Sequence, residues 1–251
     1  MNPKRLAVLA AVAAALAPAA AGRADEPADL RTDAWRAAGI TTGALLADGL
    51  LACVRTPECR ICVPSDLDED ARERLRWMGP ASAQRLSDAL ANGAIPLLPA
   101  VDALRSTRSL EGAGRDVLVV AEAASLAGLA TEAAKDGFAR RRPGLPANGP
   151  ASSAANHSLW SGHTSFAFSV AVSQATEDTL RGDAAAPLAW AIGLALATSV
   201  GYLRIAGDAH WLTDVLAGAA VGSALGVAIP LAERRLAGSV ALVPGGIAVR
   251  F

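Results

Sequence analysis

The chain lacks the strong net charge that would attract a polyelectrolyte. Its 251 residues include 23 lysines and arginines against 24 aspartates and glutamates, so the formal net charge at pH 7 is -1. The isoelectric point is near 6.3. Proteins that bind nucleic acids concentrate basic residues on one surface and usually have a basic isoelectric point. The charge balance therefore argues against a nucleic acid partner.

The chain is also poor in aromatic residues, which make up 4% of it, and it has no internal repeat. Alanine and other apolar residues dominate instead, and the mean hydropathy is +0.32. Small apolar side chains let helices approach closely, so this composition predicts tightly packed helices. The length fits one large domain better than two. Composition alone does not separate a soluble bundle from a membrane-embedded one.

Cysteine is scarce, with Cys53, Cys59 and Cys62 as the only three. Cys59 and Cys62 supply a single CxxC pair with no histidine close in sequence, which makes zinc binding the weaker alternative. In an oxidising compartment two of the three would form a disulfide. We expect that disulfide to staple a loop, and we expect no metal site.

The N-terminus resembles a secretory signal over residues 1–24. A basic start at Lys4 precedes an apolar run that is short for a membrane span and is broken by Pro18. Small residues follow, and cleavage after Ala21 or Ala24 would give an exported, periplasmic protein. An N-terminal membrane anchor is the alternative.

We expect one helical domain over residues 25–238, followed by a C-terminal tail over 239–251. The hydrophobic pattern predicts helices over residues 34–54, 71–76, 81–90, 115–137, 165–179, 187–200 and 210–232. Residues 55–70, with many charges and two prolines, are expected to form a surface loop. Residues 140–150, basic and rich in Pro and Gly, should form another.

The tail changes period, because two short apolar runs flank Pro244, Gly245 and Gly246. This pattern is typical of a β-hairpin. An isolated hairpin is marginally stable in water, so we expect this one to pack on the helices.

The segments 187–200 and 210–232 are the best candidates for membrane spans. Glu122 and Glu132 interrupt the helix at 115–137, and a lipid-facing helix tolerates carboxylates poorly. The sequence therefore favours a soluble bundle, with an integral membrane protein as the alternative.

Three short motifs carry the candidate chemistry. In RIAGDAHWLTD, which ends at Asp214, His210 precedes Asp214 by four residues, so on one helix the carboxylate would lie beside the imidazole and could orient it. Arg204 adds a cation. A solvated helix pair is the simpler interpretation of this spacing taken alone.

The second motif places Lys135 and Arg142 seven residues apart, so that on a continued helix both cations would face one anion. The third, WSGHT, opens a predicted helix: Ser161 has a hydroxyl donor, Gly162 allows close backbone approach, and His163 could transfer a proton. A basic helix end and a plain N-cap are the simpler alternatives.

Taken in order, K-x6-RP, SGH and R-x5-H-x3-D resemble the type 2 phosphatidic acid phosphatase superfamily, which includes bacterial class A acid phosphatases and vanadium haloperoxidases. The resemblance covers about residues 115–230. It implies a compact all-α helical bundle of the acid phosphatase and haloperoxidase type, here with the hairpin-like tail. It also implies a metal-independent phosphatase that acts on phosphate monoesters.

The resemblance implies that His210 attacks phosphorus, Asp214 orients it and His163 protonates the leaving group. The implied phosphate-binding residues are Lys135, Arg142, Ser161, Gly162 and Arg204. The sequence departs from the family pattern at Trp160, where proline is usual, and at Leu203, where serine is usual. We expect activity to survive both changes, with a possible change of substrate range.

The expected substrate is a phosphorylated small molecule, an isoprenyl phosphate or a lipid head group, in the last case with membrane association. No cofactor is implied, and vanadate should inhibit by occupying the phosphate site. One alternative is a vanadate-dependent haloperoxidase, for which the chain is short. The other is a non-catalytic phosphate-binding module, which the complete set of cations and histidines argues against.

Overall fold

The computed structural model describes residues 58–105, 109–150, 153–243 and 246–249. The expected signal peptide, the expected helix at 34–54 and Cys53 lie outside these residues. The described helices are α3 Asp66–Leu75, α4 Pro80–Ala89, the π-helical turn η1 Leu90–Ala94, α5 Ile95–Arg105, α6 Leu110–Phe138, α7 Ser153–Asn156, α8 Gly162–Arg181, α9 Ala186–Ala206 and α10 Leu212–Ser239.

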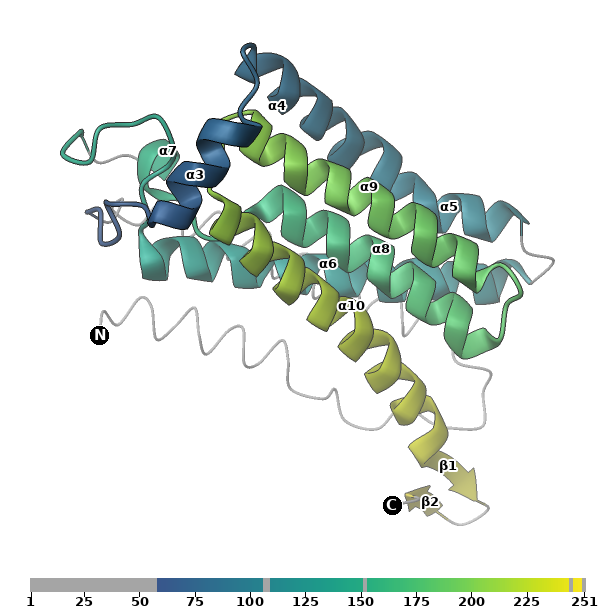
Figure 1. Cartoon of the computed structure of the whole chain (residues 1–251). Coiled ribbons are helices and arrows are strands. Elements are labelled where there is room, and N and C mark those ends of the chain that lie inside the picture. Colours follow the sequence, from purple (N-terminus) through teal and green to yellow (C-terminus); the bar gives the residue numbers. More distant parts are fainter. Residues whose placement is uncertain (1–57, 106–108, 151–152, 244–245, 250–251) are drawn as a thin grey trace.

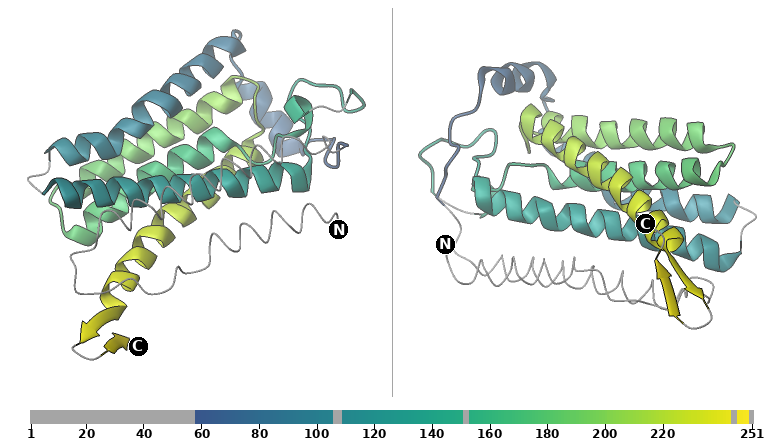
Figure 2. Two further views of the ribbon diagram at one scale, coloured as in Figure 1. Left: turned by 180° about the vertical axis from the view of Figure 1, so that it is seen from behind. Right: turned by 90° about the horizontal axis from the view of Figure 1, so that it is seen from below.

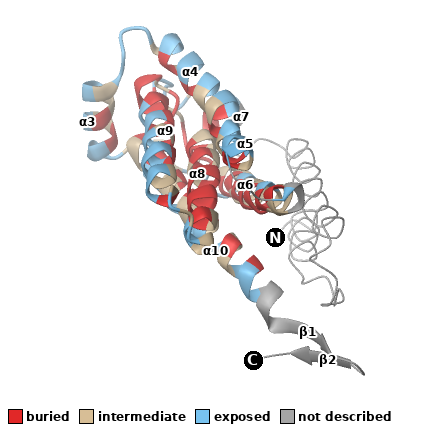
Figure 3. Cartoon of the chain, turned by 90° about the vertical axis from the view of Figure 1, so that its right-hand side faces the viewer, coloured by how far each residue is buried: buried red, intermediate tan, exposed pale blue. Residues whose placement is uncertain are grey.

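The long helices form an all-α bundle, as expected, with α8 at its centre (Figure 1). Helix α8 packs against α6, α9 and α10, while α4 packs on α9 and α5 packs mainly on α6 and α8. Figure 3 shows that α8 is buried along most of its length, whereas the outer helices expose one side. The short helices α3 and α7 lie at one end of the bundle, where the chain also connects α9 to α10.

Helix α10 crosses α8 with almost no side-chain layer between them. A Cβ built on Gly218 would lie 2.7 Å from the carbonyl oxygen of Ser161, and one built on Gly222 would lie 2.3 Å from that of Ser165. The spacing of four residues places both glycines on one face of α10, so two backbones can touch. This approach brings the first turn of α10 against the first turn of α8, where the backbone N–H of Ser161 donates to the carbonyl of Asp214 (3.1 Å).

The sequence prediction of a loop over residues 55–70 is wrong at its C-terminal end, because α3 begins at Asp66. Ser65 is the N-cap and accepts a hydrogen bond from the Asp68 backbone N–H (3.3 Å). The S-x-x-D pattern resembles a capping box, and the acidic first turn complements the helix dipole. Local capping thus outweighs the high charge that suggested a loop.

The predicted end of the helix over residues 81–90 is also wrong. Despite Gly93 and Pro96, the chain stays helical through η1 into α5. Ala91 and Ile95 are fully buried in the main core cluster with residues of α8 and α9. Burial of this apolar face outweighs the helix-breaking tendency of the local residues.

Three helices are long and apolar enough to cross a membrane: Gly112–Phe138 of α6, Ala186–Ala206 of α9 and Leu212–Arg235 of α10. Only 33% of the apolar window of α9 and 28% of that of α10 are buried within the protein. The large apolar side chains that remain exposed on α5, α9 and α10 include Leu97, Val101, Leu104, Leu188, Ile192, Leu216 and Val227. Glu122 is buried inside the bundle, so it does not face the outer surface of α6.

After α10 the backbone forms two short antiparallel strands, β1 Val240–Val243 and β2 Gly246–Val249. Figures 1 and 2 place the pair beyond the end of α10, away from the other helices. The expected packing of this tail on the helices is therefore not seen, because α10 carries the chain past the end of its neighbours.

Candidate active site

His210 lies in the turn between α9 and α10, with its side chain buried. Its Nδ1 is 2.8 Å from the backbone carbonyl oxygen of Ser158. A carbonyl oxygen can only accept, so Nδ1 carries the hydrogen and Nε2 keeps its lone pair. Burial lowers the pKa of His210 to about 3, so the ring is neutral near pH 7. The arrangement leaves the Nε2 lone pair available.

Asp214 lies behind this contact without bonding to the ring directly. Its Oδ2 is 3.8 Å from His210 Nδ1, beyond hydrogen-bond distance. The same oxygen accepts from Ser158 Oγ (2.5 Å) and from the Trp211 backbone N–H (3.0 Å). The carboxylate therefore fixes both the segment whose carbonyl holds the imidazole and the first turn of α10.

Arg140 is a member of this site that the sequence analysis treated only as part of a basic loop. Its guanidinium is buried and bridges two carboxylates, with Nη1 at 2.6 Å from Asp214 Oδ1 and Nη2 at 2.6 Å from Asp68 Oδ2. It also lies 5.9 Å from the ring centroid of Trp211. Arg140 thus joins α3 to the start of α10.

Asp68 completes the network from α3. It accepts from the backbone N–H of Thr213 (2.9 Å) and from the Thr213 hydroxyl (3.0 Å). Burial by itself would raise the pKa of Asp68, but hydrogen bonds from Thr213, Ser65 and Arg140 lower it overall, so the carboxyl is ionised. The capping pattern at Ser65 could have located the helix, but no sequence signal indicates its partner 145 residues away.

The three expected cations, Lys135, Arg142 and Arg204, come from different elements of the fold. Helix α6 ends at Phe138, and Ala139 takes a left-handed conformation. The continued helix that was expected to carry both Lys135 and Arg142 is therefore not formed. Lys135 pairs with Glu132 (2.5 Å), and a Cβ built on Gly162 would lie 3.6 Å from Lys135 Nζ. The ammonium group therefore lies beside the first turn of α8.

Arg204 is buried and Arg142 is half-buried, and each has a buried Nε–H with no hydrogen-bond partner among the described residues. Arg142 donates its other N–H groups to the carbonyl oxygens of Ala209 (3.1 Å) and His157 (3.2 Å). Burial lowers the pKa of Arg142, which bonds no carboxylate in the described structure. Buried donors of this kind normally have acceptors, so both arginines are suited to an anion.

Ser161 is the N-cap of α8, as its simpler interpretation suggested. Its Oγ accepts from the Thr164 backbone N–H (3.4 Å) and hydroxyl (2.9 Å), which leaves its own hydroxyl hydrogen available to donate. Gly162 and His163 form the first turn of the helix, whose N–H groups favour a negative charge.

His163 is partly exposed, with its Nε2 at 3.0 Å from Asp88 Oδ1. The same carboxylate oxygen lies 3.0 Å from Arg204 Nη1. Burial and the charge of Arg204 lower the pKa of His163 to about 4, with further lowering by Lys135 and Arg142 and opposition by Asp88. The three expected cations therefore act on this histidine together. Asp88, from α4, was not identified from the sequence.

The two departures from the family pattern have separate surroundings. Trp160 donates its indole N–H to Thr131 Oγ1 (2.7 Å), which ties the turn before α8 to α6. Leu203 is buried in a small cluster with Ala83 and Ala206, between α9 and α4. Leu203 therefore belongs to helix packing in this protein.

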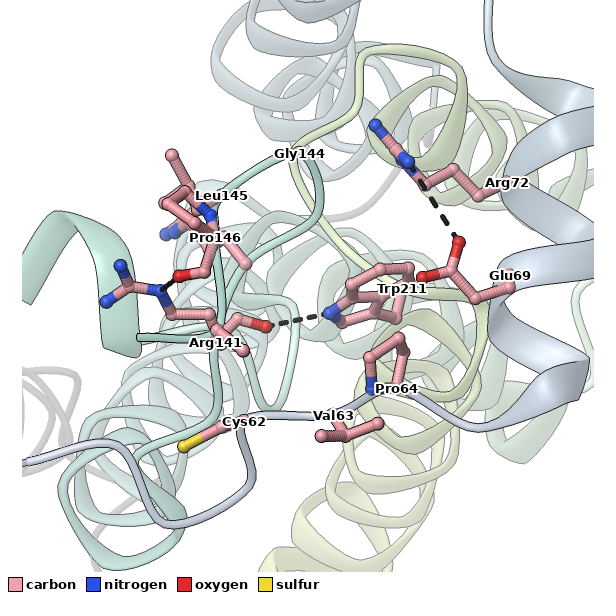
Figure 4. A pocket seen from close by; sticks show the side chains of 12 residues that line it. Cys62, Val63, Pro64, Glu69, Arg72, Arg141, Gly144, Leu145, Pro146 and Trp211 are labelled. Atoms are coloured by element: carbon pink, nitrogen blue, oxygen red, sulfur yellow. Dashed lines mark hydrogen bonds and ion pairs between the residues drawn. The ribbon is translucent and has the colours of Figure 1, made fainter. Parts of the chain in front are cut away.

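A pocket of about 470 Å³ lies beside the turn between α9 and α10 that contains His210, and it is bounded by α3 and the 141–147 loop (Figure 4). Arg142 and Trp211 line it, and Trp211 donates its indole N–H to the carbonyl of Arg141 (2.7 Å). Cys62 is also on its wall and is joined to Cys59 by a disulfide with Cα atoms 5.6 Å apart. The expected pairing within the cysteine cluster is thus Cys59 with Cys62.

One group of carboxylates among the described residues has the spacing of a metal site, namely Asp102, Asp178 and Asp183. Arg105 Nη2 lies 2.5, 3.6 and 3.2 Å from oxygens of these residues. The Arg105 guanidinium therefore already contacts all three carboxylates, and Arg181 also contacts Asp102 (3.1 Å). The group lies where α5 and α8 end, at the end of the bundle away from His210 (Figure 1).

Comparison with known proteins identifies a matching family model and two similar solved structures. A family model described as the PAP2 superfamily matches residues 116–236. The crystal structure of Aquifex aeolicus LpxE is similar with a TM-score of 0.50 and 21% identity, covering 67% of this chain and 98% of that one. The transmembrane PAP2 type phosphatidylglycerolphosphate phosphatase from Bacillus subtilis aligns with a TM-score of 0.47 and 18% identity, covering 93% and 96%. No curated protein matches the chain. Residues 116–236 of the chain therefore belong to the PAP2 superfamily.

Proposed function

We propose that this protein is a metal-independent phosphatase that hydrolyses phosphate monoesters through a phosphohistidine on His210. The observation that carries the proposal is the pair of buried Nε–H groups of Arg142 and Arg204, which have no partner among the described residues. Both arginines lower the pKa of His210 and of His163, so their charges act at both histidines. A phosphate dianion would supply the acceptors and the negative charge that this site needs.

In the first step His210 Nε2 attacks phosphorus, the bond from phosphorus to the ester oxygen breaks, and His163 gives a proton to the departing alkoxide. In the second step His163 takes a proton from water, the water oxygen attacks phosphorus, and the bond to His210 breaks. The neutral His210 ring, held by the Ser158 carbonyl, is ready for the first attack. Asp214 orients His210 through Ser158.

Charge on the phosphoryl oxygens is balanced by Lys135, Arg142 and Arg204. The Ser161 hydroxyl and the N–H groups that open α8 at Gly162 add donors. Phosphoryl transfer depends mainly on positioning and on charge compensation, which these fixed groups supply.

We infer a lipid phosphate as the substrate class, and an integral membrane protein in place of the soluble bundle that the sequence favoured. Three helices meet the length and apolarity of a membrane span, and their exposed sides are apolar. Glu122, one of the two carboxylates that argued for a soluble helix, is buried inside the bundle. The Cys59–Cys62 disulfide lies beside the site and supports the proposal that this end faces an oxidising compartment such as the periplasm.

The activity is tested with the detergent-purified protein in the presence of EDTA, by measuring phosphate release from phosphatidic acid micelles and from a soluble alkyl phosphate. We expect release from both, faster from the lipid, unchanged by EDTA and inhibited by vanadate. Halide oxidation by hydrogen peroxide after vanadate addition would indicate the haloperoxidase alternative. Phosphate binding without release from any ester would indicate a non-catalytic module.

The membrane location is tested by fractionation of cells that express the full chain. We expect the protein to resist extraction by alkaline carbonate and to dissolve only in detergent, because moving its exposed apolar helix surfaces from lipid into water is unfavourable. Intact cells should also hydrolyse an added membrane-impermeant phosphomonoester, as a site facing the periplasm requires. Recovery of the protein in the carbonate supernatant would reject the spanning arrangement.

A further inference from the structure

Asp88 connects two parts of the proposed machinery from a helix outside the segment 116–236 that matches the family. Its Oδ1 lies 3.0 Å from His163 Nε2 on α8 and 3.0 Å from Arg204 Nη1 on α9. The side chain of Asp88 is half exposed. One oxygen atom thus bridges the expected proton donor and an expected phosphate ligand.

The position of Asp88 is fixed by the way α4 packs along α9. Gln84 donates to the carbonyl of Gly207 (2.6 Å), and the fully buried Ser87 faces the carbonyl of Val200 (3.5 Å). On the other side of Asp88, Asn92 in η1 donates to the Asp88 carbonyl (2.9 Å). The π-helical turn follows directly after α4, and such turns often occur at functional sites. The carboxylate is therefore held at a set place beside the two helices.

We propose that Asp88 is a positioning residue that holds the general acid His163 and the phosphate ligand Arg204 in register. The inference rests on the phosphatase function proposed above. A carboxylate oxygen accepts the Nε2–H of His163, so Nδ1 is the nitrogen that exchanges protons with the substrate. The Nδ1 proton passes to the alkoxide in the first step, and Nδ1 receives a proton from water in the second. The Nε2–H stays on Asp88 throughout.

The charges around His163 make such a partner necessary. Arg204, Lys135 and Arg142 all disfavour a protonated ring, whereas Asp88 favours it. Asp88 also engages Nη1 of Arg204, which leaves the unpartnered Nε of that residue for the phosphate. Removing the carboxylate would therefore disfavour the protonated form of His163, which must donate the proton, while the phosphate ligands remain.

The test compares two substrates that differ in their need for a general acid. An alkyl phosphate releases a strongly basic alkoxide that must be protonated, whereas p-nitrophenyl phosphate releases a weakly basic phenolate. We expect Asp88→Ala to lower kcat for the alkyl phosphate by roughly 10–100-fold, and kcat for the aryl phosphate by less than about threefold. Asp88→Asn, which keeps an acceptor oxygen but loses the charge, should be intermediate.

His163→Ala should give the same substrate dependence, and Asp88→Ala should cause little further loss in that background, because both changes remove one function. Asp70→Asn, an exposed substitution on α3, is the matched control and should behave as wild type for both substrates. An equal loss for both esters would overturn the proposal, since it would reduce Asp88 to a support for Arg204 or for folding. Tighter vanadate binding with unchanged kcat would also overturn it, because Asp88 would then be a competitor of phosphate. A wild-type protein that cleaves neither ester would instead reject the proposed function.

Discussion

Replacing His210 by alanine is expected to lower kcat by roughly 10⁴-fold or more, the scale seen when a catalytic nucleophile is removed. In wild type the buried ring is neutral, and the Ser158 carbonyl fixes which nitrogen carries the hydrogen. The measurement is steady-state phosphate release by the purified variant in the detergent used for wild type.

A trapping experiment makes the role of His210 specific. With a ³²P-labelled ester, rapid quenching at alkaline pH should yield labelled wild-type protein whose label is lost in acid, as expected for a phosphohistidine. His210→Ala should give no label while retaining the thermal unfolding midpoint of wild type to within a few degrees. A variant with more than a tenth of wild-type turnover would contradict the mechanism.

Replacing Arg140 by methionine should produce the largest loss of stability. The guanidinium lies between Asp68 and Asp214, both almost completely buried, and removing it leaves two carboxylates without their shared cation. Breaking a buried ion pair of this kind typically costs about 3–5 kcal/mol. We expect a loss of that size in the free energy of unfolding, measured by denaturant titration in detergent, together with reduced activity.

Arg74→Met is the matched control, because Arg74 is exposed on the same helix that carries Asp68. It should change the stability by less than about 0.5 kcal/mol. Adding Asp68→Asn to Arg140→Met should recover part of the stability, since one of the two uncompensated charges is then removed. If Arg140→Met proves as stable as Arg74→Met, the bridge has no structural role.

Several elements of the fold follow from local sequence patterns. The predicted helices at 81–90 and 115–137 correspond to α4 and α6, because their apolar periodicity is regular and their ends carry clear signals. The predicted helix over residues 187–200 lies within α9 in the same way. The order of the three motifs also indicated the superfamily. At α3 the local capping signal of Ser65 outweighs the high charge that suggested a loop. At η1 burial of Ala91 and Ile95 against distant helices outweighs the local glycine and proline.

By itself the sequence determined which residue types were available for the site: two histidines, three cations and a helix N-terminus in a fixed order along the chain. Only the tertiary structure decided which groups hold them. Ser158, rather than Asp214, contacts the His210 ring, and Arg140 joins Asp214 to Asp68.

Asp88 likewise reaches His163 and Arg204 only because α4 packs along α9. These contacts join residues that are 52 to 116 positions apart in the chain. No local periodicity encodes such a contact, because it depends on how the helices pack and on the requirement that buried charges find partners.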